Sequence, residues 1–339
     1  MTEFKKLLVL CLLIALAIPQ DTAFAQDMKK ENEKPKIALA LGGGGARGAA
    51  HVGVLKVLEE NGLKPDLIVG NSMGAIVGGM YCAGVPLEKI ELLIRDGKVK
   101  KAFKPVPPVV QVFKKIVHVF KFWGPEDYPG FYSGEALEKF ISKQVEEDRQ
   151  KLETTSPKFA CTAVDLMDGN AYRLEEGDLA KALRASSSFP PLLQPVPIED
   201  HVFTDGGVRS NVPTFSAKGM GADYIIAVNV DEKIEKIDRK QIDSYTELVN
   251  RLSSIIIYLR DKELLKQANL VIQPDVSGIS VLSVEKDDYI AAVKAGEDAA
   301  RKALPELKKA FTARDGGTLT SSLPQFATDD QNYRNSKRL

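Results

Sequence analysis

Short apolar runs alternate with longer amphipathic stretches along the first part of the chain. Residues 36–41 and 67–69 are apolar runs of strand length, which predicts two buried strands. Between them, residues 49–61 place Val54, Leu55 and Leu58 on one side of a helix and charged residues on the other. This strand-helix-strand order predicts a parallel sheet that is covered by helices on both faces.

The same patterns predict further elements towards the C-terminus. Strands are predicted at 159–164, 171–174, 201–204, 224–230 and 270–273, with a hairpin turn at Asp168-Gly169. Helices are predicted at 179–187, 244–267 and 284–309, and Pro305 is expected to kink or divide the last one. The predicted fold class is therefore α/β, with a mostly parallel central sheet.

The two ends of the chain differ in composition from the middle. Residues 1–25 contain two lysines, an apolar run and an Ala-Phe-Ala ending, which is typical of a signal peptide, with a retained N-terminal anchor as the alternative. Residues 26–35 predict a charged linker, and residues 313–339 predict a disordered polar tail. We therefore expect a single folded domain over residues 36–312, in a periplasmic or secreted protein.

Charge and cysteine content narrow the range of partners. The chain has 46 basic and 46 acidic residues, and this balance argues against a nucleic-acid-binding protein. The sequence has no Cys/His cluster of the kind that binds a structural metal. Cys82 and Cys161 lie in apolar surroundings, which favours buried free thiols over a disulfide.

Residues 99–132 interrupt the strand-helix rhythm. Three prolines precede a stretch, residues 109–123, whose apolar side chains fall on one side at helical spacing and whose lysines fall on the other. One interpretation is a helix packed on the core. The other is a lid over an apolar site, or a patch that contacts a membrane surface.

A G-x-S-x-G stretch follows the second predicted strand. A serine at such a strand-to-helix turn presents its hydroxyl outwards, and Gly70 and Gly74 permit the tight turn. Ser72 is therefore a candidate nucleophile, which needs a base and a site for the developing oxyanion.

The glycine-rich loop after the first strand is the candidate oxyanion hole. Backbone N–H groups of Gly43, Gly44 and Gly45 can approach a substrate oxygen closely, and the N–H of Met73 is a further donor. The same loop, up to Gly48, also fits a dinucleotide-binding pattern. That pattern requires an acidic residue at the end of the second strand, where this chain has Gly70-Asn71-Ser72, so the cofactor interpretation is disfavoured.

The residues alone leave the base for Ser72 open. His51 follows the glycine loop, where a helix-packing or capping role is the simpler account, and His118 lies on the polar side of residues 109–123. His201 is expected at a surface turn. Asp205 is the alternative, because a carboxylate at a strand end, before Gly206-Gly207, could take the serine proton directly.

Three motifs together resemble, in order and spacing, the patatin-like phospholipases. They are Gly43-Gly44-Gly45-Ala46-Arg47-Gly48, Gly70-Asn71-Ser72-Met73-Gly74 and Asp205-Gly206-Gly207. Further similarity lies in residues 51–55, 185–191 and 211–213. The resemblance covers about residues 36–230 and is greatest to the bacterial branch related to neuropathy target esterase.

The resemblance implies a three-layer α/β/α fold and a catalytic dyad, with Ser72 as nucleophile and Asp205 as base. It also implies a glycine-loop oxyanion hole that Arg47 helps to shape, and hydrolysis of phospholipid or other lipid esters without metal or cofactor. Asn71 departs from the family, in which many members have threonine, and this bears on substrate preference. The alternative functions are a lipid acyltransferase and a non-catalytic protein that binds membrane lipids.

Overall fold

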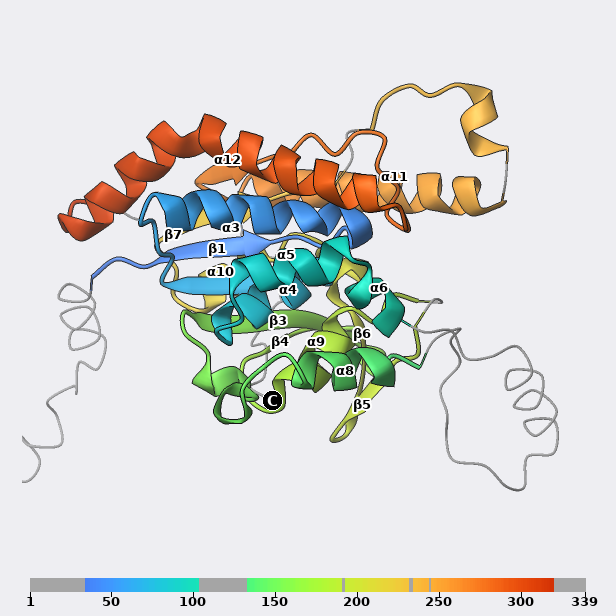
Figure 1. The fold of residues 1–339 in the computed structure, drawn as a ribbon, viewed down its shortest axis with the longest axis horizontal. Coiled ribbons are helices and arrows are strands. Elements are labelled where there is room, and N and C mark those ends of the chain that lie inside the picture. Colours follow the sequence, from blue (N-terminus) through green and yellow to red (C-terminus); the bar gives the residue numbers. More distant parts are fainter. Residues whose placement is uncertain (1–33, 104–132, 191–192, 232–233, 244, 320–339) are drawn as a thin grey trace, which may run out of the picture. The chain divides into compact units, whose positions relative to one another are not determined.

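A mixed β-sheet runs through the middle of the fold (Figure 1). The computed structural model describes residues 34–103, 133–190, 193–231, 234–243 and 245–319, and its main compact unit begins at Pro35. Strand β1 (Ile37–Leu41) lies between β2 (Leu67–Gly70) and β7 (Tyr224–Val228), and both neighbours run parallel to it.

The outer strands include both orientations. On one side β8 (Leu270–Ile272) pairs in parallel with β7, and on the other β3 (Lys158–Asp165) pairs in parallel with β2. Three antiparallel strands complete this end of the sheet: β4 (Ala171–Leu174) and β6 (His201–Asp205) pair with β3, and β5 (Val196–Ile198) pairs with β6. The expected α/β class with a mostly parallel sheet is confirmed.

Helices cover both faces of the sheet. On one face lie α3 (Ala50–Glu60), α4 (Met73–Cys82), α5 (Leu87–Arg95) and α12 (Lys286–Asp315). Helix α9 (Leu179–Ser186) packs on β3 and β6, with α8 (Glu135–Ser142) against it. On the opposite face lie α10 (Thr214–Gly219) and the end of α11 (Tyr245–Leu265). A short helix, α6 (Lys98–Ala102), follows α5.

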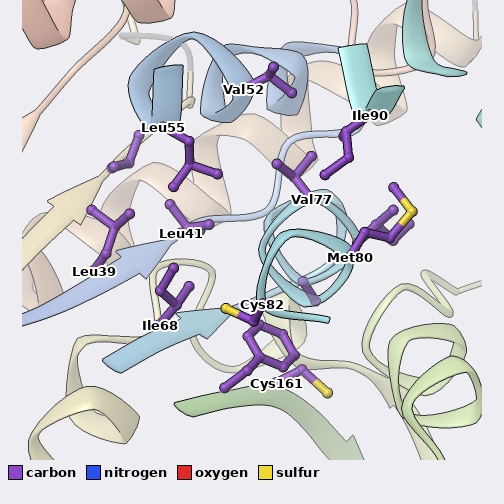
Figure 2. Packing of buried hydrophobic residues seen from close by; sticks show 14 of the residues in the cluster. Leu39, Leu41, Val52, Leu55, Ile68, Val77, Met80, Cys82, Ile90 and Cys161 are labelled. Atoms are coloured by element: carbon purple, nitrogen blue, oxygen red, sulfur yellow. The ribbon is translucent and has the colours of Figure 1, made fainter. Parts of the chain in front are cut away.

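Successive side chains along a strand point to opposite faces of the sheet, and this alternation explains the three layers. Leu39 and Leu41 of β1 point into the larger core with α3 and α4, whereas Ala38 and Ala40 point to the opposite core with α10. Figure 2 shows Leu39, Leu41 and Ile68 of the sheet against side chains from the helices, among them Val52, Leu55, Val77, Met80 and Ile90. In β1 the small residues thus face the core with α10, and the large ones face the core with α3 and α4.

Helix α12 lies along α3 on the outer side of the larger core (Figure 1). The two backbones approach closely at Gly53 and Gly296: a Cβ atom on Gly296 would lie 1.9 Å from Ala50 O. Pro305 lies inside α12 and does not divide it, contrary to one of the two expectations. Leu307 and Phe311, buried beyond the proline, hold the second half of the helix on the core, and the burial offsets the lost hydrogen bond.

The C-terminal boundary expected at residue 312 falls inside α12. Arg314 is buried, and its Nη1 donates to Lys64 O at 2.7 Å and to Asp66 Oδ2 at 3.1 Å. The predicted signal peptide, most of the linker, residues 109–123 and the tail beyond residue 319 lie outside the described residues. Within the described parts of the chain, no helix is long and apolar enough to cross a bilayer.

The pattern did not predict β5, α5, α6, α8 and α10, which are short elements, and it placed the ends of the others within a few residues. Cys82 and Cys161 are buried free thiols, as expected (Figure 2). Burial raises the pKa of both thiols, so they remain protonated and behave as small apolar side chains.

Candidate active site

Strand β3 brings Ser72 and Asp205 together. Residues 161–164 of β3 pair with β4 on one edge, so β2 and β6 lie end to end on its other edge. Gly70 ends β2 opposite Cys161, and Asp205 ends β6 opposite Ala163. Because β6 is antiparallel to β3, the carboxyl ends of β2 and β6 face each other, about 7 Å apart along β3.

Ser72 occupies the sharp turn between β2 and α4. Its φ of 52° and ψ of −121° lie in a region that side chains rarely adopt, and among the described non-glycine residues only Ser72 and Glu199 have positive φ. The Ser72 N–H donates to Ser186 O and Ser186 Oγ, each at 3.2 Å. The turn is therefore tied to the end of α9, and the predicted strand-serine-helix corner is present.

Asp205 is buried, and its Oδ1 accepts hydrogen bonds from Gly207 N–H at 2.8 Å and from Asn71 Nδ2 at 3.3 Å. The side chain of Ser72 lies near this carboxylate. Burial raises the pKa of Asp205 to about 6, although the two hydrogen bonds and the Ser72 side chain favour the ionised form. The carboxyl therefore titrates close to neutral pH beside the serine.

Asn71 connects the residues around Asp205. It is fully buried, and Nδ2 donates to Asp205 Oδ1 and to Asn211 Oδ1, both at 3.3 Å. Its Oδ1 accepts from Thr162 Oγ1 at 3.0 Å. An amide has two N–H donors, whereas a threonine hydroxyl has one, so asparagine binds both partners at this position where threonine would bind one.

The glycine loop lies directly beside Ser72. A Cβ atom on Gly43 would lie 2.4 Å from Asn211 Oδ1 and 3.1 Å from Ser72 Cβ, so this close approach requires glycine. Gly45 has a φ of +54°, which also favours glycine. Within the described residues the N–H groups of Gly44 and Gly45 have no acceptor. The N–H of Gly43, expected to be a free donor, is instead bonded to Asn211 O at 3.2 Å, because the 211–213 segment packs against the loop.

His51 and Arg47 support the loop from the helix side. His51 is fully buried, and its Nε2–H donates to Gly42 O at 2.7 Å. Burial lowers the pKa of His51 to about 4, so the ring is neutral at physiological pH, in agreement with the expected packing role. Arg47 is buried in the short helix η1 (Gly45–Ala49), and its Nε donates to Ile279 O.

The remaining motif glycines occupy close contacts around the same turn. Gly70 and Gly74 pack backbone to backbone within the serine corner, Gly48 lies against Met73, and Gly206 and Gly207 lie against Asn71. The structure therefore brings all the predicted site residues of the three motifs to one place. Asn211 and Thr162 also belong there. Asn211 belongs to the stretch 211–213 that resembles the family, but no sequence pattern indicates Thr162.

His201 differs from the expectation of a surface turn. It is the first residue of β6, its side chain is 20% exposed, and Nδ1 contacts Asp165 Oδ2 at 2.7 Å. The rings of Tyr172 and Phe203 pack beside it. His201 lies four positions before Asp205 along the strand, a distance of about 13 Å. His118 lies outside the described residues. Among the histidines described, neither contacts Ser72.

Residues 39–218, more than half of the chain, match the model of the patatin-like phospholipase family, so the chain belongs to that family. Patatin-like phospholipase domain-containing protein 6 of Mus musculus is 32% identical over 202 residues, which cover 59% of this chain and 14% of the relative.

Two further relatives are similar to this chain over stretches of comparable length. Lysophospholipase nte1 of Emericella nidulans is 29% identical over 222 residues, 65% of this chain and 13% of the relative. An uncharacterised NTE family protein of Mycobacterium bovis is 28% identical over 200 residues, 59% of this chain and 50% of the relative. The chain thus spans between about an eighth and a half of the length of these relatives.

The raised pKa of Asp205 predicts a pH-dependent stability. A carboxyl whose pKa is 3.8 in the unfolded chain and about 6 in the fold is stabilising below pH 3.8, and this contribution is lost as the pH rises through 6. We expect the unfolding free energy of Asp205→Asn, relative to that of wild type, to rise by up to about 3 kcal/mol between pH 4 and pH 8. Urea unfolding at several pH values measures the difference.

The matched control is Asp298→Asn, because that carboxylate is exposed on α12. It should track the wild type across the pH range. A difference between Asp205→Asn and wild type that stays constant from pH 4 to pH 8 would contradict the perturbed ionisation of Asp205.

Proposed function

We propose that this protein hydrolyses carboxylic esters of lipids, with Ser72 as nucleophile and Asp205 as its base. The observation that carries the proposal is the position of a buried carboxylate beside the serine turn, because β2 and β6 end facing each other on one edge of β3. A base is most effective when its pKa lies near the working pH, and the pKa of Asp205, about 6, meets this requirement.

The first chemical step is acylation of Ser72. Ser72 Oγ attacks the ester carbonyl carbon while its proton passes to Asp205. The negative charge that develops on the carbonyl oxygen is stabilised by the N–H groups of Gly44 and Gly45, which have no acceptor in the described part of the chain. The N–H of Met73, at the start of α4, is a further donor, and the partial positive charge of that helix end adds to it. The C–O bond then breaks, and Asp205 returns the proton to the leaving alcohol.

The second step regenerates the enzyme. Asp205, again ionised, accepts a proton from a water molecule that attacks the acyl carbon. Collapse of the second tetrahedral intermediate releases the fatty acid, and Ser72 recovers its proton from Asp205. A single carboxylate thus serves as base and acid in turn, and neither step requires a histidine.

The lipid substrate class is supported by the relatives and by the surface around the site. Two relatives carry the names phospholipase and lysophospholipase. Loops next to Asp205 expose large apolar side chains: Leu166, Met167, Phe189 and Val208. The hydrogen bond from Arg209 Nη1 to Gly169 O holds two of these loops together. An acyl chain that approaches Ser72 would find apolar surface here.

Export and membrane contact are part of the proposal and rest on the sequence. We propose that residues 1–25 direct export, so that the mature protein begins at Gln26 in the periplasm or outside the cell. N-terminal sequencing of the processed protein tests this. We further propose that residues 109–123 contact a membrane surface. Phe113→Ser/Phe120→Ser/Trp123→Ser should then lose liposome binding, and unchanged binding by the folded variant would exclude this role.

The function is tested by hydrolysis of short- and long-chain esters, phosphatidylcholine and lysophosphatidylcholine. Ser72→Ala should lose at least about 1,000-fold in kcat/KM, and Asp205→Asn about 100- to 10,000-fold, because each removes one partner of the proton transfer. His201→Ala should change kcat/KM by less than about threefold. Ser277→Ala, at an exposed serine, is the control for the first variant.

Other outcomes separate the alternatives. A loss in folded His201→Ala as large as in Asp205→Asn would indicate a Ser-His-Asp triad. Transfer of the acyl group to added alcohol in preference to water would indicate an acyltransferase. Liposome binding by a wild-type protein that hydrolyses none of these esters would favour a lipid-binding role.

A further inference from the structure

The side-chain amide of Asn71 fills the space between the glycine loop and the Asp205 turn. Asn71 is fully buried, and its backbone N–H donates to Leu41 O at 2.9 Å, which fixes the residue at the end of β1. A Cβ atom on Gly43 would lie 3.0 Å from Asn71 Nδ2, and a Cβ atom on Gly207 would lie 3.1 Å from the same atom. The backbones of both loops therefore pack directly against one amide, which sets the distance between them.

Both polar atoms of this amide are hydrogen-bonded. Its Oδ1 accepts from Thr162 Oγ1 at 3.0 Å, and its Nδ2 donates to Asp205 Oδ1 and to Asn211 Oδ1, each at 3.3 Å. A reversed amide would place its oxygen against the acceptor oxygens of Asp205 and Asn211, so only the observed orientation is favourable. The amide is therefore a fixed donor to two neighbours at once.

Asn211 extends this contact to the glycine loop. Its Nδ2 donates to Gly43 O at 3.1 Å, and its backbone O accepts from Gly43 N–H at 3.2 Å. Because Asn211 Oδ1 accepts from Asn71, the Asn211 amide presents its N–H groups, and not its oxygen, to Gly43 O. Asn71 is thus one hydrogen bond away from the proposed base and two away from the loop that lines the proposed oxyanion site.

The two oxygens of Asp205 differ in their surroundings. Oδ1 accepts from Gly207 N–H at 2.8 Å and from Asn71 at 3.3 Å, and two donors occupy the lone pairs of one carboxylate oxygen. Oδ2 is then the oxygen available to the proton of Ser72. Besides burial, the described groups that shift the pKa of Asp205 are neutral: Asn71, Ser72 and Gly207 N–H. Loss of the Asn71 hydrogen bond, which favours the ionised form, should therefore raise this pKa.

We propose that Asn71 is a positioning residue of the hydrolase. Its amide holds Asp205 Oδ1, so that Oδ2 takes the proton of Ser72, and through Asn211 it keeps the glycine loop beside the same serine. The proposal rests on the function proposed above. One buried, neutral side chain thus sets the base and the oxyanion site in a single arrangement, and its removal should impair both.

Two substitutions of Asn71 test this role. Asn71→Leu has nearly the same shape and no polar atom, so it loses the bonds to both Asp205 and Asn211. Asn71→Thr supplies a single O–H donor, so it keeps no more than one of these two bonds and provides the test if the leucine variant does not fold. The matched control is Thr155→Val, which removes a buried hydroxyl bond to Leu152 O, 2.7 Å long, outside the site.

The first readout is kcat/KM for a short-chain ester from pH 4 to pH 9. Asn71→Leu should lose about 10- to 100-fold at pH 8, mostly in kcat, because the reacting groups are misplaced. The midpoint of the acid limb should rise by about one pH unit, because the ionised form of Asp205 loses a hydrogen bond. Thr155→Val should keep the wild-type pH profile. Activity of Asn71→Leu within about threefold of wild type, or an unmoved acid limb, would overturn the proposal.

Amide NMR tests the positioning without catalysis. Gly207 N–H donates to Asp205 Oδ1, so its chemical shift follows the ionisation of that carboxyl. In Asn71→Leu the midpoint of this titration should rise from about 6, and hydrogen–deuterium exchange at the Gly43 amide should become at least about tenfold faster. Asn71→Thr should change at least one of the two quantities, and Thr155→Val should change neither.

Wild-type values of either quantity in Asn71→Leu, or of both in Asn71→Thr, would overturn the positioning role, whether or not the wild type hydrolyses esters. Absence of ester hydrolysis together with the expected NMR changes would overturn the proposed function and leave the positioning of the two loops supported.

Discussion

The buried carboxylate of Asp205 is the constraint on which the rest of the site depends. A charge removed from water is costly unless hydrogen-bond donors surround it. Here the donors come from the Gly206-Gly207 turn and from Asn71, and the Ser72 side chain lies nearby. They do not abolish the cost of burial, and the remaining imbalance raises the pKa of the carboxyl to about 6. The same imbalance gives the proposed base a strength suited to neutral pH.

The geometry of the backbone places these donors around Asp205, and no chain of hydrogen-bonded side chains is needed to do so. Strands β2 and β6 meet end to end on one edge of β3, so the serine turn and the aspartate turn face each other. The close packing of Gly43 against Ser72 adds the third component, the glycine loop. Asn71 and Asn211 then join the three turns through neutral amides, which supply donors and acceptors without adding charge.

The sequence predicted those features that short stretches determine. The strands at 36–41 and 67–69, the corner at Ser72 and the glycine loop follow from local patterns, and the resemblance to a family assigned Asp205. The meeting of β2 and β6 depends on β3 and β4, which lie some ninety residues further along the chain, so no local pattern reveals it. The bond of His201 to Asp165 is likewise long-range. Pro305 stays within one helix because burial beyond it outweighs a local rule.

The most direct test of the account is labelling by an alkyl fluorophosphonate, followed by peptide mass spectrometry. Ser72 Oγ would attack phosphorus and release fluoride while its proton passes to Asp205. We expect one adduct, on the peptide that contains Ser72, at a rate that falls in acid with a midpoint near pH 6. An adduct on another serine, or a Ser72 adduct that forms at the same rate at pH 5 and pH 8, would contradict a Ser72–Asp205 pair.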